Sequence, residues 1–384
     1  MRRLVLLLWM AGLAAPGLAA RPVSVEQLQQ LVTAVRGKAD TQAAQQIYEL
    51  ELTERLSPER LAHLQAELPG VASREALVAI ADAAAFLDLP PADLPAKPAP
   101  DSEEQRLLWA MALDYASRTI PRLPNFFATR DTVRFQDMPS QPPRGPTDTI
   151  KYEPLHPVGA ATATVLYRDG QEFVDAGGKQ HKSFDPSDFE LSTTGEFGPV
   201  LGTALADSAL TGVTWSHWEQ APAGTMAVFR YAVSREASHY TVGFPSPTHE
   251  TRFLSAYHGE IGIDPADGSI LRITMVADLK PSDPGTKAGM LVEYGPVEIG
   301  GGTYVCPAKS VALSQVWMVR IESNSMRGEH SSRVALQTRV NDLAFRDYHL
   351  FRGDVRILSG DAAVTDGNGS VPAPTPPPAA SPNR

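Results

Sequence analysis

The residues of this sequence best suited to holding a ligand are aromatic, and they gather in its second half. They fall on expected strands, where alternate side chains share one face. Aromatic side chains on one face could hold an acyl chain or a hydrophobic peptide segment. Ordinary core packing explains the same alternation, which marks a buried face without showing what fills it. The candidate ligand-binding residues are Trp215, Trp218, Phe229, Tyr231, Tyr257, Tyr294, Tyr304 and Trp317.

Histidine is the residue type here that could bind a metal ion. His217, His239, His249 and His258 fall within one region of the expected sheet. Zinc sites usually show paired ligands at close spacing, and neither an H-x-x-x-H nor an H-E-x-x-H pattern occurs. The spacing therefore favours separate surface or edge histidines, and we expect neither a metal site nor a cofactor.

The sequence lacks the arrangements typical of nucleophilic or phosphate-binding enzymes. No G-x-S-x-G nucleophile elbow is present. Cys306, followed by Pro307, falls inside an expected strand and is predicted to be a small buried hydrophobic residue. Gly300-Gly301-Gly302 lacks the Lys and Ser/Thr of a phosphate loop, and Asp264–Gly268 fits a type I turn better than a calcium loop. We therefore expect a protein that is not an enzyme, with no catalytic residues.

The charge balance argues against a nucleic-acid partner. The 384 residues include 34 Lys and Arg against 44 Asp and Glu, for a net charge of −10. Binding to nucleic acid depends largely on neutralising phosphates with Lys and Arg. The basic cluster comprises Arg118, Arg122, Arg130 and Arg134, and it is interleaved with Asp131 and Asp137. It is therefore expected to be a solvated or ion-paired face rather than a site for an anionic head group.

Residues 1–20 have the order of a secretory signal peptide. Met1-Arg2-Arg3 is a basic start, the apolar run Leu4–Ala11 follows, and Gly17-Leu18-Ala19-Ala20 supplies small residues for cleavage. The alternative, an uncleaved anchor, is disfavoured because the apolar run is too short to span a bilayer comfortably. We therefore expect a periplasmic or otherwise exported protein, with no transmembrane segment after signal cleavage.

Residues 21–89 are expected to form a small helical domain. Ser24 and Gln27 are spaced as a capping box, and Ser57-Pro58 is a typical N-cap followed by proline in the first turn. Apolar residues then recur at helical spacing. Residues 90–101 follow as a Pro-rich linker, since five prolines within residues 90–100 favour a stiff extended chain.

Residues 102–358 are expected to contain a helix and then a large antiparallel sheet. Apolar residues alternate with polar ones in stretches such as Thr225–Val233 and Ser269–Asp278, as in strands with one buried face. A short helix, Phe197–Ala209, is expected between strands. Thr251–Ile263 is expected as one strand, and Thr119–Arg134 is expected to lead into the first strand. The fold class predicted is α+β, with a helical N-terminal domain followed by a large antiparallel sheet curled as a half-barrel.

The end of the chain is expected to lack order. Asp354–Leu358 is the last strand expected. Residues 359–384 are small, polar and rich in proline, and contain no aromatic residue, which is typical of a disordered tail. Two alternatives stay open for this tail, a tethering or wall-threading segment and a solvated tail with no role.

Three stretches of the expected sheet carry a resemblance to a known family. They read HGEIGIDPADGSILRITMVADL, AGMLVEYGPVEIGGGTYVCPAKSVALS and RVNDLAFRDYHLFRGDVRIL. Together they resemble the sheet region of periplasmic outer-membrane lipoprotein carriers and the related sigma-factor-regulator sensor proteins. The chain is also similar to exported bacterial proteins that pair a helical N-terminal part with such a sheet. The resemblance implies a half-barrel over an apolar cavity that helices close.

The sequence therefore leads to one functional expectation and one alternative. The first is an exported cell-envelope protein that binds a hydrophobic ligand, either a lipid or a lipoprotein acyl group, in a sheet cavity without catalysis. The alternative is an envelope sensor or scaffold that binds a protein partner by its sheet edge or its helical domain.

Overall fold

The structure is a computed structural model of the 384-residue chain. It describes residues 20–138, 152–175, 191, 193, 195–222, 224–245, 250–324 and 328–351. Residues 1–19 of the expected signal peptide, the expected strand Asp354–Leu358 and the expected tail lie outside these ranges. Within them, no helix combines the length and the apolar character needed to cross a membrane.

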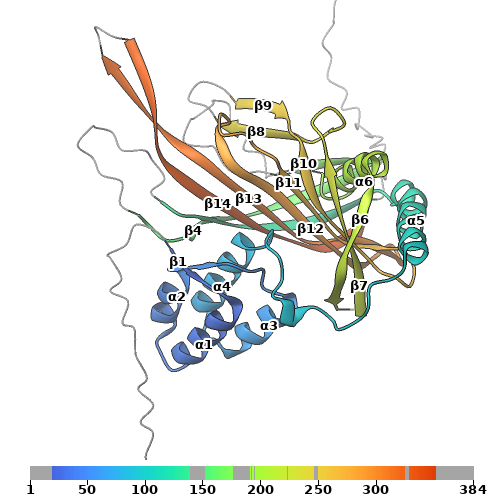
Figure 1. Ribbon diagram of the computed structural model, residues 1–384, viewed down its shortest axis with the longest axis horizontal. Coiled ribbons are helices and arrows are strands. Elements are labelled where there is room, and N and C mark those ends of the chain that lie inside the picture. The colour runs from blue at the N-terminus through green and yellow to red at the C-terminus, as the bar shows by residue number, and fades with distance from the viewer. Residues whose placement is uncertain are drawn as a thin grey trace, which may run out of the picture. The chain divides into compact units, whose positions relative to one another are not determined.

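The N-terminal part is a cluster of helices held by its own apolar core (Figure 1). Ser24 caps the first helix as predicted, because its side chain accepts a hydrogen bond from the Gln27 N–H while Gln27 Oε1 accepts one from the Ser24 N–H. A short parallel strand pair, which the sequence pattern does not predict, joins the cluster's start to its middle. The elements are β1 (Arg21–Val23), α1 (Val25–Val35), α2 (Asp40–Tyr48), β2 (Leu50–Leu52), α3 (Pro58–Glu67) and α4 (Val71–Ala83).

The Pro-rich segment after α4 lies against the sheet. The indole Nε1 of Trp218 donates a hydrogen bond to the carbonyl oxygen of Pro98 at 2.8 Å, and Lys97 Nζ lies 3.3 Å from the centre of its ring. Asp101 caps the helix that follows, since its carboxylate accepts hydrogen bonds from two backbone N–H groups. The elements here are η1 (Pro91–Asp93), α5 (Ser102–Thr119) and η2 (Ile120–Arg122).

Ten strands form one sheet in which every neighbouring pair is antiparallel, in the order β5-β4-β3-β14-β13-β12-β11-β10-β7-β6 (Figure 1). Its strands are β3 (Phe126–Gln136), β4 (His156–Arg168), β5 (Gln171–Asp175), β6 (Val213–Ala221), β7 (Gly224–Val233), β10 (Tyr257–Ile263), β11 (Ile270–Ala277), β12 (Gly285–Ile299), β13 (Gly302–Asn324) and β14 (Gly328–Leu350). Helix α6 (Pro199–Thr211) precedes β6, and β8 (Thr241–Pro245) with β9 (Glu250–Leu254) forms a separate hairpin. The predicted α+β class is thus confirmed.

The prediction that the sheet curls into a half-barrel is wrong, because the sheet is neither closed nor strongly curled. Met290 and Val292 of β12 pack in one core cluster with α5 and α6, whereas Leu291 packs in another with α4. Successive residues of a strand point to opposite faces, so the helices cover both faces of the sheet. Apolar residues on both faces are therefore buried by helices, and the sheet need not curl on itself to shield them.

The predicted strands agree with the structure to within a few residues at most positions, with two informative exceptions. Thr251–Ile263, expected as one strand, is divided between β9 and β10 at Ser255, whose N–H donates to the carbonyl oxygen of Tyr240. The stretch 119–134, expected only to lead into the sheet, contains most of β3, which lies between β4 and β14.

Candidate functional site

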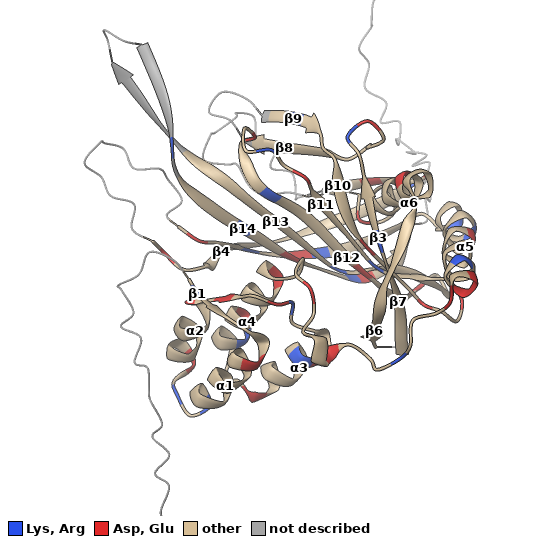
Figure 2. Ribbon diagram, in the orientation of Figure 1, with Lys and Arg blue, Asp and Glu red and all other residues tan. Residues whose placement is uncertain are grey.

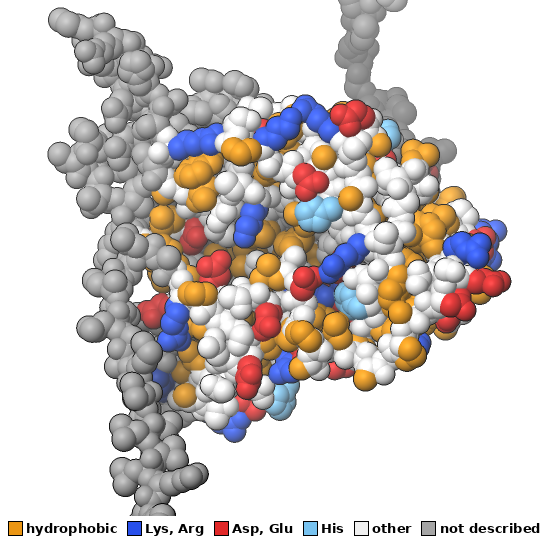
Figure 3. All heavy atoms as spheres, in the orientation of Figure 1, with side chains coloured by type: hydrophobic (Ala, Val, Ile, Leu, Met, Phe, Trp, Pro, Cys, Tyr) orange, Lys and Arg blue, Asp and Glu red, His pale blue; other side chains and the backbone are white. Residues whose placement is uncertain are grey.

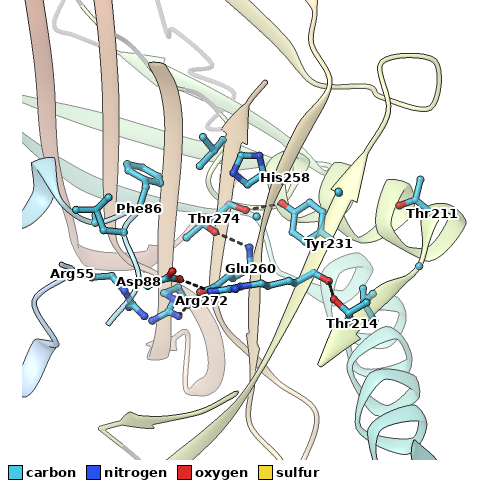
Figure 4. A pocket seen from close by; sticks show the side chains of 18 residues that line it. Arg55, Phe86, Asp88, Thr211, Thr214, Tyr231, His258, Glu260, Arg272 and Thr274 are labelled. Atoms are coloured by element: carbon cyan, nitrogen blue, oxygen red, sulfur yellow. Dashed lines mark hydrogen bonds and ion pairs between the residues drawn. The ribbon is translucent and has the colours of Figure 1, made fainter. Parts of the chain in front are cut away.

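A hollow of about 750 Å³, here called the outer groove, lies between the end of α4 and the strands β6, β7, β10 and β11 (Figure 4). Its lining includes Arg55, Phe86, Asp88, Thr211, Thr214, Tyr231, His258, Glu260, Arg272 and Thr274. Apolar groups from the segment that follows α4 form part of one wall, and charged groups gather at one end (Figure 4). Its size falls in the range of ligand pockets, so its charges decide what it can bind.

The charged groups of the outer groove form a continuous chain of ion pairs. Glu219 of β6 accepts two hydrogen bonds from Arg55 and two from Arg272. Arg272 also pairs with Glu260 at 3.3 Å, Glu260 pairs with Arg230 at 3.0 Å, and Arg230 pairs with Asp88. Each of these charges therefore already has an opposite partner within the protein, which leaves little net charge to attract an ionic ligand.

The centre of this chain is buried, which makes it a structural bridge. Arg55, Glu219 and Arg272 are 7%, 1% and 3% exposed. Burial alone would raise the pKa of Glu219, but the hydrogen bond from His217 and the two guanidinium groups outweigh it and hold that pKa well below its usual range. Arg55 precedes α3, whereas Glu219 and Arg272 belong to the sheet, so the bridge joins the helical part to β6 and β11.

A second hollow of about 320 Å³, here called the inner pocket, lies on the face of the sheet that α6 covers. Strands β11, β12 and β13 form its floor, while α6, β8 and the residues just before β8 form its walls. None of its described lining residues is Asp, Glu, Lys or Arg. The lining comprises Leu191, Thr193, Pro199, Val200, Thr203, His239, Tyr240, Thr241, Val242, Gly243, Phe244, Met275, Ala288, Gly289, Met290, Leu313 and Ser314.

One polar constellation borders the inner pocket. Asp207 of α6 is fully buried, and its carboxylate accepts hydrogen bonds from His239 Nδ1 at 2.6 Å, from the His239 N–H at 3.0 Å and from Tyr257 Oη at 2.8 Å. Burial would raise the pKa of Asp207, but these hydrogen bonds outweigh it and lower that pKa. The His239 side chain is 74% exposed, so a buried negative charge orients an accessible imidazole.

The eight aromatic residues expected to bind a ligand lie away from the lining of the inner pocket. Trp215 contacts the rings of Trp218 and Phe229, with centroids 4.9 and 5.5 Å apart. The rings of Tyr231 and Tyr257 meet at 5.7 Å. Tyr294 donates a hydrogen bond to the carbonyl oxygen of Glu196, Tyr304 packs beside the cluster around Cys306, and Arg333 lies over the ring of Trp317. Tyr231 also lines the outer groove.

Of the four histidines considered as metal ligands, the three that the structure describes have separate carboxylate partners. His217 contacts Glu219 at 3.2 Å, and His258 contacts Asp278 at 2.7 Å. His249 lies outside the described residues. Among the residues that are described, no group of three or more His, Cys, Asp or Glu side chains is arranged to hold a metal ion.

Other residues considered for chemistry also have structural surroundings. Cys306 is buried, and burial raises the pKa of its thiol to about 12, so the thiolate that reacts is scarce at neutral pH. Arg118, in the stretch expected to be ion-paired, pairs with Asp114 on α5. Figure 2 shows both signs of charge on this helix, and Figure 3 shows them interspersed over the face drawn.

A buried carboxyl pair supports the start of α6 and has no signature in the sequence. Glu172 Oε2 accepts hydrogen bonds from the N–H groups of Gly195 and Phe197 at 3.1 and 3.3 Å. Burial and the neighbouring Glu196 raise the pKa of Glu172 to about 7. Thr193 donates a hydrogen bond to Glu196 and also lines the inner pocket. The pair therefore holds the segment that leads into one pocket wall.

No protein-family model, curated protein or solved structure matches this chain. The function proposed below therefore depends on the chain's own residues and their geometry.

Proposed function

We propose that this chain is an exported cell-envelope protein that binds a hydrophobic ligand, such as a lipid or a lipoprotein acyl group, in the inner pocket and performs no reaction on it. Helix α6 serves as the lid of this pocket. The pocket is formed by α6 and the β8–β9 hairpin over an open sheet, so no curled sheet is needed to enclose a ligand.

The observation that carries this proposal is the chemical contrast between the two hollows. Arg55, Asp88, Arg230, Glu260 and Arg272 line the outer groove, whereas the described lining of the inner pocket contains no such charge. Burying an acyl chain against apolar side chains contributes about 25 cal/mol per Å² before entropy costs. The same chain would gain less in the outer groove, where it would separate charged groups from water.

The floor of the inner pocket suits a flexible chain. Met275 and Met290 face each other across the β11–β12 pair, and both line the pocket. Methionine side chains are unbranched and polarisable, so they adapt to irregular apolar ligands. Ala288 and Ser314, paired across β12 and β13, extend the floor with small side chains that leave room above the sheet.

The proposal can be tested by placing a bulky side chain of α6 in the pocket. Purified full-length protein is expected to yield bound lipid on solvent extraction and mass spectrometry, and to bind the neutral apolar dye N-phenyl-1-naphthylamine in competition with methyl dodecanoate. Thr203→Trp places an indole in the pocket wall and should abolish both. Leu210→Trp is the matched control, because Leu210 lies on the same helix and is 78% exposed. Absence of lipid and dye binding in the wild-type protein, or equal binding by the Thr203→Trp variant, contradicts the proposal.

A further inference from the structure

The imidazole of His239 is a polar group of the inner pocket whose orientation a buried charge fixes. Asp207 binds both the ring nitrogen Nδ1 and the backbone N–H of this residue. Tyr257 donates to the same carboxylate, which holds Asp207 in place from the core side. A fully buried carboxylate therefore holds this residue at two points, one on its ring and one on its backbone, although the side chain itself is largely exposed.

This arrangement determines which nitrogen is left for a ligand. An ionised carboxylate only accepts hydrogen bonds, so Nδ1 of His239 must carry a hydrogen. The other ring nitrogen, Nε2, has no partner among the described residues. It offers a lone pair to a proton donor when the ring is neutral, and an N–H to an anion when the ring is protonated.

We infer that the ligand of the inner pocket is a long-chain carboxylic acid, whose carboxyl group lies at Nε2 of His239 and whose chain lies over Met275 and Met290. This inference rests on the proposed function. The carboxyl oxygen and Nε2 share one proton in a hydrogen bond, and either the acid or the imidazole can carry it. The hydroxyl groups of Thr203 and Thr241, which also line the pocket, supply neutral hydrogen-bonding groups.

The charges around the pocket favour a carboxyl head over a phosphate. Phosphate groups in proteins are commonly bound by Arg forks or Lys. The described lining holds neither, and the carboxylates that contact its residues His239 and Thr193, those of Asp207 and Glu196, are acidic. When the shared proton is counted on the acid, a carboxyl head adds no charge beside Asp207, whereas a phosphate monoester holding the same proton still carries a negative charge there.

The experiment compares ligands of one chain length that differ only in the head. Binding of dodecanoic acid, methyl dodecanoate and 1-dodecanol to the full-length protein is measured at pH 7 by displacement of N-phenyl-1-naphthylamine. The wild-type protein should prefer the acid by about tenfold, as expected for one charge-assisted hydrogen bond. In His239→Ala this preference should fall to within about twofold, with the affinity for the ester and the alcohol unchanged.

His258→Ala is the matched control. His258 is also exposed and also has its Nδ1 on an aspartate, Asp278 at 2.7 Å, but it lines the outer groove. This variant should keep the wild-type preference for the acid. Equal affinity for acid and ester in the wild-type protein, or a preserved preference in His239→Ala, overturns the carboxylic-acid assignment and leaves the proposed function standing. Binding of none of the three ligands overturns both.

Discussion

Arg55 and Glu219 are 164 positions apart in the sequence, yet two guanidinium nitrogens of Arg55 contact the two carboxylate oxygens of Glu219 at 3.0 and 2.6 Å. Arg272 approaches the same carboxylate in the same two-point manner. Removing one member of a buried ion pair leaves an uncompensated charge in a poorly solvated place, which costs far more than the pair itself contributes.

Glu219→Gln should therefore destabilise the protein strongly, because Arg55 loses its carboxylate partner and Arg272 keeps only Glu260. The expected loss is about 3–5 kcal/mol in the free energy of unfolding, measured with urea. Asp114→Asn is the control, since Asp114 pairs with Arg118 on the exposed side of α5 and should cost about 1 kcal/mol or less. Equal effects of the two substitutions would show that the buried bridge has no special role.

Stability should fall as the pH rises from about 4.5 to about 7, partly because of Glu172. Its pKa is raised from an ordinary 4.5 to about 7, so the folded chain holds this proton more tightly than the unfolded chain does. Below about pH 4.5 this carboxyl is protonated in both states, so it does not change the free energy of unfolding. Above about pH 7 it is ionised in both states, and its full destabilising effect is present. Glu172→Gln should match the wild type at low pH and exceed it at pH 8 by an amount on the order of 2 kcal/mol.

Urea unfolding of the wild type and Glu172→Gln at pH 4, 6 and 8 tests this prediction. Part of the slope should remain in the variant, because burial also raises the pKa of Asp82 to about 7 despite its Lys309 partner. Glu298→Gln, which changes an exposed carboxylate of β12, should keep the wild-type profile. If the free energies of unfolding of the wild type and Glu172→Gln changed in parallel with pH, the raised pKa of Glu172 would be contradicted.

The aromatic cluster around Phe229 should support the core rather than the ligand. Phe229 is 2% exposed and packs against Trp109 of α5 and Trp215 of β6. Phe229→Leu should lower the free energy of unfolding by roughly 1–2 kcal/mol through lost burial. Its affinity for dodecanoic acid should equal that of the wild type. A large loss of affinity with little loss of stability would instead make this cluster the binding site.

Two glycine-to-alanine changes should shift stability in opposite directions. A Cβ on Gly259 would lie 1.8 Å from the carbonyl oxygen of Thr274 and 2.8 Å from the hydroxyl of Tyr231, so Gly259→Ala must displace β10 and should cost roughly 2–3 kcal/mol. Gly202 lies inside α6 with open space around it, so Gly202→Ala should stabilise the helix by about 1 kcal/mol. Thermal unfolding of both variants gives the comparison, and a tolerated Gly259→Ala would contradict the close approach.

Local chemistry explains why much of the secondary structure can be predicted from this sequence. The capping box at Ser24 and the alternation in Thr225–Val233 depend on residues that are near neighbours in the chain. The shape of the sheet depends instead on what covers its second face. The buried run Met290-Leu291-Val292 shows that both faces are covered, but a pattern cannot show that α4 lies on one face and α6 on the other.

The candidate site was predictable only in part, for a related reason. Alternation correctly marks Phe229 and Tyr257 as buried, but a buried aromatic face looks the same in sequence whether a helix or a ligand fills it. His239 attracts notice among the histidines. Its partner Asp207 lies 32 positions earlier on a helix, and nothing in the spacing joins them. Only the fold brings the buried carboxylate to the imidazole beside an apolar pocket.

The position of β3 between β4 and β14 sets the order in which the molecule can assemble. The ion pair between Asp131 and Arg346 closes a span of 215 positions, and loops this long form slowly. The helical cluster before residue 90 depends mainly on contacts between residues that are near in sequence. It can therefore form during synthesis, before the last strand, β14, completes the sheet. A chain interrupted before residue 328 would leave the edges of β3 and β13 without β14, and such open edges invite aggregation.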